Sequence, residues 1–177
     1  MRVLLDTCVL YPPHLRNLLL DLAAQGAFAP LWSTGIAAEW LHLASRRGPD
    51  GVAGADIALC RMRAAFPGGE VTEAAARMDA TTADLPDAGD MHVLAAALAG
   101  GAALILTANL RDFPPRVLAP YGLRAQSPDD FVMDHWLKAP ALVEGTVTTL
   151  WPGLSGPTLR RALKKAGLPR LGKALGA

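Results

Sequence analysis

Short apolar runs alternate along this chain with longer segments of helical periodicity. The runs at 2–5, 103–106 and 123–126 are too short for helices and predict strands, and 29–32 predicts a further strand or an extended entry. Periodicity and capping residues predict helices at 15–24, 33–47, 50–66, 88–98, 127–137, 141–150 and 157–166. The segment 70–83 is ambiguous and is expected to be helical in part. Strands that alternate with helices predict an α/β fold, with a parallel sheet covered by helices on both faces.

Composition narrows the class of protein further. A chain of 177 residues that is 51% hydrophobic and 19% charged is expected to fold and not to be disordered. Its two cysteines exclude a disulfide framework and a cysteine-rich zinc site, and are typical of a reducing cytoplasm. The segment 91–110 is uncharged apart from His92, but Gly100 and Gly101 interrupt it, so we expect a helix and a buried strand and no membrane span.

The charge is distributed unevenly along the chain. Residues 1–144 carry eleven basic and sixteen acidic side chains, a net −5, whereas 145–177 carries +6 with no acid. We predict a first domain at 1–138 and a basic helical extension at 139–177, divided at the Ala139-Pro140 break. The extension is expected either to face an anionic partner or to fold back on the acidic body.

Five carboxylates recur at positions where a site can form. Asp6 follows the first strand and Asp112 follows the strand at 103–106, and ligands of open α/β sheets bind beyond the carboxyl ends of strands. Asp87 and Asp90 stand at a helix start, where capping explains either of them equally well. Glu39 interrupts an apolar helix and is expected either on a solvated face or in a site. Converging carboxylates repel unless a cation neutralises them, and an oxygen-only donor set favours Mg²⁺ or Mn²⁺.

Three stretches together resemble the PIN-domain family of nucleases, most closely its VapC-type toxins: LLDTCVLYP, IAAEW and LPDAGDMHVLAAALAGGAALILTANLRDFP. The resemblance implies a three-layer α/β/α domain with a parallel sheet of about five strands. It implies metal-dependent hydrolysis of RNA phosphodiesters, leaving 5′-phosphate and 3′-hydroxyl ends. The catalytic and metal-binding residues that it implies are Asp6, Glu39, Asp90 and Asp112, with Thr107, Asn109 and Asp87 in supporting roles.

The same resemblance implies partners as well as an RNA substrate. We expect an antitoxin protein, a cytoplasmic location and a homodimer, the last also because the chain is rich in apolar residues. The tail helix at 157–166 is expected to bury Leu159 and Leu163 and to turn its cations toward RNA: Arg160, Arg161, Lys164 and Lys165. Alternatively, these cations pair with Asp129, Asp130 and Asp134 and only tether the tail.

Two other functions compete with a nuclease. A haloacid-dehalogenase-type phosphatase also begins with an aspartate after its first strand, but it needs an acid two residues later, where this chain has Cys8. A non-catalytic PIN-fold binding module, acting through a protein partner or the basic tail, remains open, and stabilisation by Mn²⁺ would separate it from a metal-dependent enzyme. We expect Cys8 to be a small buried residue, and His92 to serve packing or lie on the surface and not to be catalytic.

Overall fold

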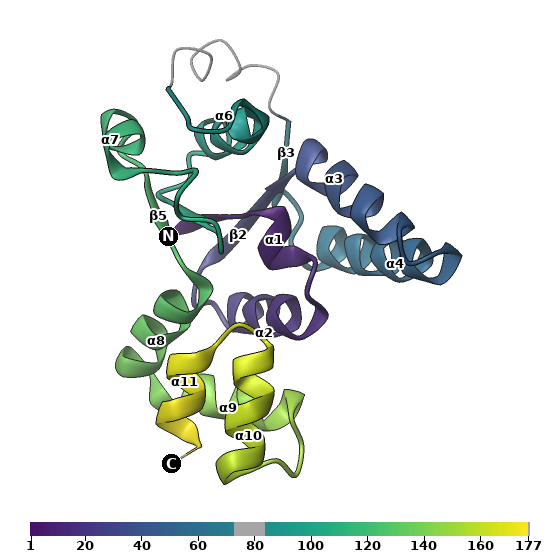
Figure 1. Cartoon of the computed structure of the whole chain (residues 1–177), viewed down its shortest axis with the longest axis vertical. Coiled ribbons are helices and arrows are strands. Elements are labelled where there is room, and N and C mark those ends of the chain that lie inside the picture. Colours follow the sequence, from purple (N-terminus) through teal and green to yellow (C-terminus); the bar gives the residue numbers. More distant parts are fainter. Residues whose placement is uncertain (73–83, 177) are drawn as a thin grey trace.

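A computed structural model describes residues 1–72 and 84–176 (Figure 1). Five parallel strands form one sheet in the order β3-β2-β1-β4-β5. Their bounds are β1 Arg2–Leu5, β2 Ala29–Ser33, β3 Glu70–Val71, β4 Leu104–Leu106 and β5 Arg124–Gln126. The central register pairs Leu4 with Leu31 on one side and with Ile105 on the other.

Helices cover both faces of this sheet, so the predicted three-layer α/β/α fold is confirmed. The described helices are α1 Thr7–Leu10, α2 Pro13–Ala24, α3 Thr34–Ser45, α4 Pro49–Ala65, η2 Ala88–Asp90, α6 Met91–Ala99, α7 Pro115–Leu118, η3 Ala119–Tyr121, α8 Pro128–Lys138, α9 Pro140–Leu150, α10 Gly156–Lys165 and α11 Pro169–Leu175. Figure 1 shows α6 and α7 above the sheet, α2 and α8 below it, and α3 with α4 at one side. Because both faces are covered, β4 and the last three residues of β1, Val3 to Leu5, are fully buried and form continuous apolar runs.

The segment 91–110 folds as its glycines predict. Helix α6 ends at Ala99 with Gly100 as its C-cap, and Ala103 then leads into β4. No helix among the residues that the structure describes is long and apolar enough to cross a membrane.

The segment 70–83, expected to be helical in part, begins with a strand. Glu70 and Val71 form β3, paired with Trp32 and Ser33 of β2. Gly69 allows this close approach, because a Cβ at that position would lie 2.5 Å from the Trp32 ring. A strand of two residues is too short to show a period of its own, and 73–83 lies outside the described residues.

Short helices begin where the sequence analysis expects none. Asp6 is the N-cap of α1, since its Oδ1 accepts a hydrogen bond from the Thr7 amide at 2.6 Å. Asp6 therefore caps a helix that hydrophobic periodicity does not predict, because α1 is only four residues long. Helices α7 and α11 are also not predicted from the sequence. Each begins at a proline and has two turns or fewer, which is too short for a helical period to show.

The C-terminal helices pack onto the first 138 residues. Helix α9 contacts α2 and α8, and α11 contacts α8 and α10. Leu163, Leu168 and Leu171 are completely buried and belong to the same apolar cluster as the sheet. The carboxylate of Asp129, itself buried, accepts hydrogen bonds from the backbone amides of Arg170 at 2.8 Å and Leu171 at 3.2 Å. A boundary at residue 138 stays a prediction.

Candidate active site

Asp6 lies at the carboxyl end of β1, next to the end of β4. Its Oδ2 accepts hydrogen bonds from the Thr107 hydroxyl at 2.7 Å and from the Cys8 thiol at 3.1 Å. The side chain is 8% exposed and therefore held in one orientation. Because β1 and β4 are parallel neighbours, residues that follow them meet at one edge of the sheet.

The loop after β4 extends this edge with amide and carboxylate groups. The Asn109 backbone amide donates to the Thr107 hydroxyl oxygen at 3.0 Å. The Asn109 side-chain amide donates in turn to Oδ2 of Asp112. The structure thus connects Asp6, Thr107, Asn109 and Asp112 in one continuous hydrogen-bond network.

Asp90 is the N-cap of α6 and is electrostatically coupled to the same group of acids. Its pKa is raised from 3.8 to about 6, first by burial and then by the negative charges of Asp6, Asp112 and Asp87. A hydrogen bond with Asp112 adds to this rise. Asp87 is exposed and accepts a hydrogen bond from the Gly89 amide at 2.8 Å, so a capping role accounts for it.

Glu39 reaches the site through Thr7. The Thr7 hydroxyl donates to Glu39 Oε2 at 2.6 Å, while the Thr7 backbone amide donates to Asp6. His92 Nε2 stands 3.6 Å from the same Glu39 oxygen. The Glu39 side chain is 46% exposed, so it is neither fully solvated nor buried. The Thr7 hydroxyl contacts it on one side and the His92 ring on the other.

The chemistry of these donors fits a hard divalent cation. The charges of Asp6, Asp112 and Asp87 contribute to the raised pKa of Asp90, and a bound cation would neutralise them; Mg²⁺ and Mn²⁺ prefer such oxygen ligands. In the arrangement seen here, no three acidic, histidine or cysteine side chains of the described residues stand close enough together to hold a metal ion. Small cations of this kind keep several water ligands, so fewer than three direct protein ligands suffice to bind one.

Cys8 is a structural member of the site. Burial and the neighbouring charge of Asp6 raise the pKa of its thiol to about 12. The thiol donates to Asp6, and its sulfur accepts from the Ala108 amide at 3.2 Å. A thiol that stays protonated is a poor nucleophile, which agrees with the packing role expected for Cys8.

Sequence reasoning missed two residues of this site. No sequence pattern predicts a role in the site for Thr7. A hydroxyl directly after a strand-end aspartate can nevertheless connect that aspartate to a neighbouring element. The sequence favours packing or a surface position for His92, because a lone histidine on an apolar helix is usually structural. Its position two residues after Asp90, within the first turn of α6, was the available signal.

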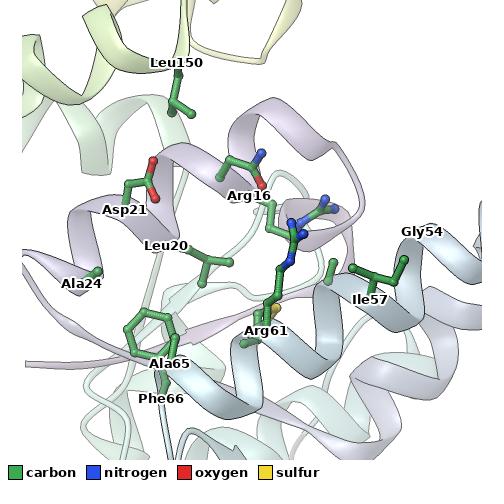
Figure 2. Close-up of a pocket in the computed structure, with 13 residues that line it drawn as sticks. Arg16, Leu20, Asp21, Ala24, Gly54, Ile57, Arg61, Ala65, Phe66 and Leu150 are labelled. Carbon is green, nitrogen blue, oxygen red and sulfur yellow. The ribbon is translucent and has the colours of Figure 1, made fainter.

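A separate cavity of about 410 Å³ lies between α2 and α4 (Figure 2). The apolar side chains of Leu20, Phe66 and Leu150 line it, and Figure 2 shows Arg61 extending from α4 toward α2. Ile57, also in the lining, is 54% exposed. The carboxylates of the candidate active site do not line this cavity, so the two features are distinct.

Comparison with known proteins identifies the class to which this fold and site belong. The PIN domain family matches residues 2–111, more than half of the chain, so the chain belongs to the PIN-domain family. A protein of Mycobacterium tuberculosis named "Putative ribonuclease VapC50" is 50% identical over 46 residues, which are 26% of this chain and 27% of that protein. The chain therefore aligns with only about a quarter of that relative's length, and no solved structure matches it. These findings confirm the PIN-domain and VapC-type resemblance of the sequence motifs.

Proposed function

We propose that this chain is an endoribonuclease that depends on Mg²⁺ or Mn²⁺ and acts as the toxin of a toxin–antitoxin pair. The observation that carries the proposal is the hydrogen-bond network that connects Asp6 and Asp112 through Thr107 and Asn109 at one sheet edge, beside Asp90, whose pKa is raised first by burial and then by the charges of these acids. Membership of the PIN-domain family and the partial similarity to a protein named as a ribonuclease support the same activity.

In this proposal Asp6, Glu39, Asp90 and Asp112 hold the cation. When bound, such a cation supplies an activated water and stabilises the charge that develops on the phosphodiester. Thr107 orients Asp6 through its 2.7 Å hydrogen bond, and Asn109 orients Asp112. Thr7 keeps Glu39, in the middle of α3, beside Asp6 at the end of β1.

Cleavage of RNA by the purified chain tests the proposal. We expect cleavage with Mn²⁺, none with EDTA, and none from Asp6→Asn, which retains the size of Asp6 and an oxygen to cap α1 but loses the charge. The non-catalytic binding module predicts a different result: Mn²⁺ leaves the thermal stability unchanged and no preparation cleaves RNA. Full cleavage by Asp6→Asn would remove Asp6 from the catalytic residues.

We further propose that the basic face of α10 contacts the RNA backbone. Arg160, Arg161, Lys164 and Lys165 are all exposed, and no ion pair within 1–72 and 84–176 includes them. Arg170 of α11, in contrast, pairs with Asp130. This residue fits the alternative in which cations of the tail only tether it to the rest of the chain. Changing the four α10 cations to glutamine in an Asp6→Asn background should weaken RNA binding and flatten its salt dependence by about 0.7 per lost phosphate contact.

Protein partners complete the proposal: a homodimer, and an antitoxin in a reducing cytoplasm, where Cys8 and Cys60 stay free. The cavity between α2 and α4 supports a protein partner, because it combines exposed Ile57 with Arg61, which forms no ion pair in the described parts of the chain. Light scattering of the purified chain tests the dimer. An Ile57→Asp variant that still binds the co-expressed antitoxin normally would exclude this cavity as the contact.

A further inference from the structure

Arg16 of α2 is a half-buried cation for which the described residues supply no opposite charge. Its guanidinium lies over the Trp40 ring, 4.8 Å from the ring centroid, and Nη1 donates a hydrogen bond to the Leu10 carbonyl oxygen at 2.8 Å. Nε is shielded from solvent and has no hydrogen-bond partner in this part of the chain. No ion pair within 1–72 and 84–176 includes Arg16. The charge is thus fixed in place and not neutralised there.

Such an arginine is unfavourable for the isolated chain. Burial lowers the pKa of the Arg16 guanidinium, and no carboxylate of the described residues opposes this effect. Asp21 and Asp50 each line a cavity that Arg16 also lines, but neither forms an ion pair with it. A charge removed from water without an opposite charge costs free energy, and a buried donor without a partner requires an explanation. An anion that reaches Arg16 would remove both costs.

The cavity between α2 and α4 gives an anion access to Arg16. Arg16 and Arg61 both line this space of about 410 Å³, and Figure 2 shows Arg61 extending into it from α4. Arg61 is exposed and also belongs to no ion pair of the described residues. Leu20, Met62 and Phe66 contribute an apolar lining beside the two guanidinium groups. This combination suits a carboxylate that is attached to, or flanked by, apolar groups.

The apolar part of the cavity favours a protein over RNA as the source of the anion. The Ile57 side chain in the lining is 54% exposed, and apolar surface of this kind is covered by apolar side chains. A polynucleotide backbone would place its charges against the same surface without covering it. An acidic side chain with apolar neighbours satisfies both halves of the cavity.

We propose that this cavity binds an acidic side chain of the protein partner, with Arg16 as the counter-ion of its carboxylate. The proposal rests on the protein partner proposed above. A guanidinium has five N–H groups in a planar fork, and the bond to Leu10 uses one, so two others can hold a carboxylate by parallel hydrogen bonds. Stacking on Trp40 orients the fork before the partner binds. Apolar neighbours of the acidic residue exclude water from the ion pair and strengthen it.

Hexanoate is a probe of this site that requires no identified partner. In an NMR titration of the full chain, we expect hexanoate to shift backbone amide resonances of α2 and α4. It should bind at least about tenfold more tightly than hexan-1-ol, because only the carboxylate pairs with Arg16. Inorganic phosphate, which has no apolar part, should bind more weakly than hexanoate. Equal affinities for hexanoate and hexan-1-ol, tighter binding of phosphate, or no binding of hexanoate would overturn the carboxylate site.

Two arginine variants connect the probe to the partner. Arg16→Met should abolish hexanoate binding and weaken binding of the co-expressed antitoxin at least about tenfold, because the carboxylate loses its counter-ion. Arg46→Met is the matched control: Arg46 is exposed at the end of α3 and does not line this cavity, so both affinities should stay within about twofold. The antitoxin complex should bind no hexanoate, since the partner's acidic side chain fills the cavity.

The failures of this inference and of the proposed function are distinguishable. If Arg16→Met binds the antitoxin normally, or if the complex binds hexanoate as tightly as the free chain, the partner does not use Arg16, and the proposed nuclease and its antitoxin stand. If no antitoxin binds the wild type, the proposed partner is itself wrong, and its carboxylate fails with it. The comparison of hexanoate with hexan-1-ol in the wild type gives its answer even if Arg16→Met does not fold.

Discussion

Replacing Asp90 by asparagine should stabilise the metal-free protein. Burial, followed by the negative charges of Asp6, Asp112 and Asp87, raises the pKa of Asp90 from 3.8 to about 6, so the folded state resists ionisation of this carboxyl group. A shift of this size corresponds to at most about 3 kcal/mol at neutral pH. Asp90 is only partly buried, and solvent screening reduces the expected gain to about 1 kcal/mol, or about 2–4 °C in Tm.

The gain should depend on pH in a defined direction. Below the unfolded pKa of 3.8 the carboxyl group is protonated in both the folded and the unfolded state, so it does not lower the free energy of unfolding. Between pH 3.8 and about 6 the unfolded chain has lost the proton while the folded chain retains it, and wild-type stability falls relative to the variant. Above about pH 6 the difference is constant. The variant's advantage should therefore be full at pH 7.5 and severalfold smaller at pH 4.

Urea unfolding in EDTA at these two pH values measures the effect. Asp87→Asn is the matched control, because it removes the same charge from an exposed cap where asparagine also caps well, and it should change stability by less than about 0.5 kcal/mol. Saturating Mn²⁺ should reverse the order, since only the wild type gains the full free energy of cation binding. An Asp90→Asn variant that is less stable than wild type at pH 7.5 without metal would refute the proposed cost of ionising Asp90 in the folded state.

Three further substitutions test how the tail is attached, each by urea unfolding. Asp129→Ala should cost about 2 kcal/mol, because two backbone amides at the start of α11 lose a buried carboxylate acceptor; no loss would show that water replaces it. Gly172→Ala should cost about 1–3 kcal/mol, since its Cβ would lie 3.0 Å from the Arg160 carbonyl oxygen, whereas an unchanged stability would mean that α10 and α11 separate freely. Leu163→Ala should cost about 2–5 kcal/mol through a core cavity, against less than about 0.5 for the exposed Leu154→Ala, and equal effects would contradict a shared core.

The sequence by itself determined the architecture of this protein. The buried parts of β1 and β4 consist only of apolar residues. Several helices begin at cap residues that the sequence alone identifies, such as Ser127, whose side-chain oxygen accepts a hydrogen bond from the Asp130 amide. These features depend on neighbours within a few residues, and such local rules identify them. The positions of Asp6 and Asp112 after strands likewise follow from the topology of a parallel sheet.

Only the tertiary structure decided how the site residues are connected. The hydrogen bond from Thr7 to Glu39 joins positions 32 apart, and the one from Thr107 to Asp6 joins positions 101 apart. The orientation of His92 toward Glu39 depends on how α6 and α3 pack, and the attachment of α11 depends on the buried Asp129. No local pattern encodes such contacts, because each one forms only after distant elements have buried their apolar faces against the same sheet.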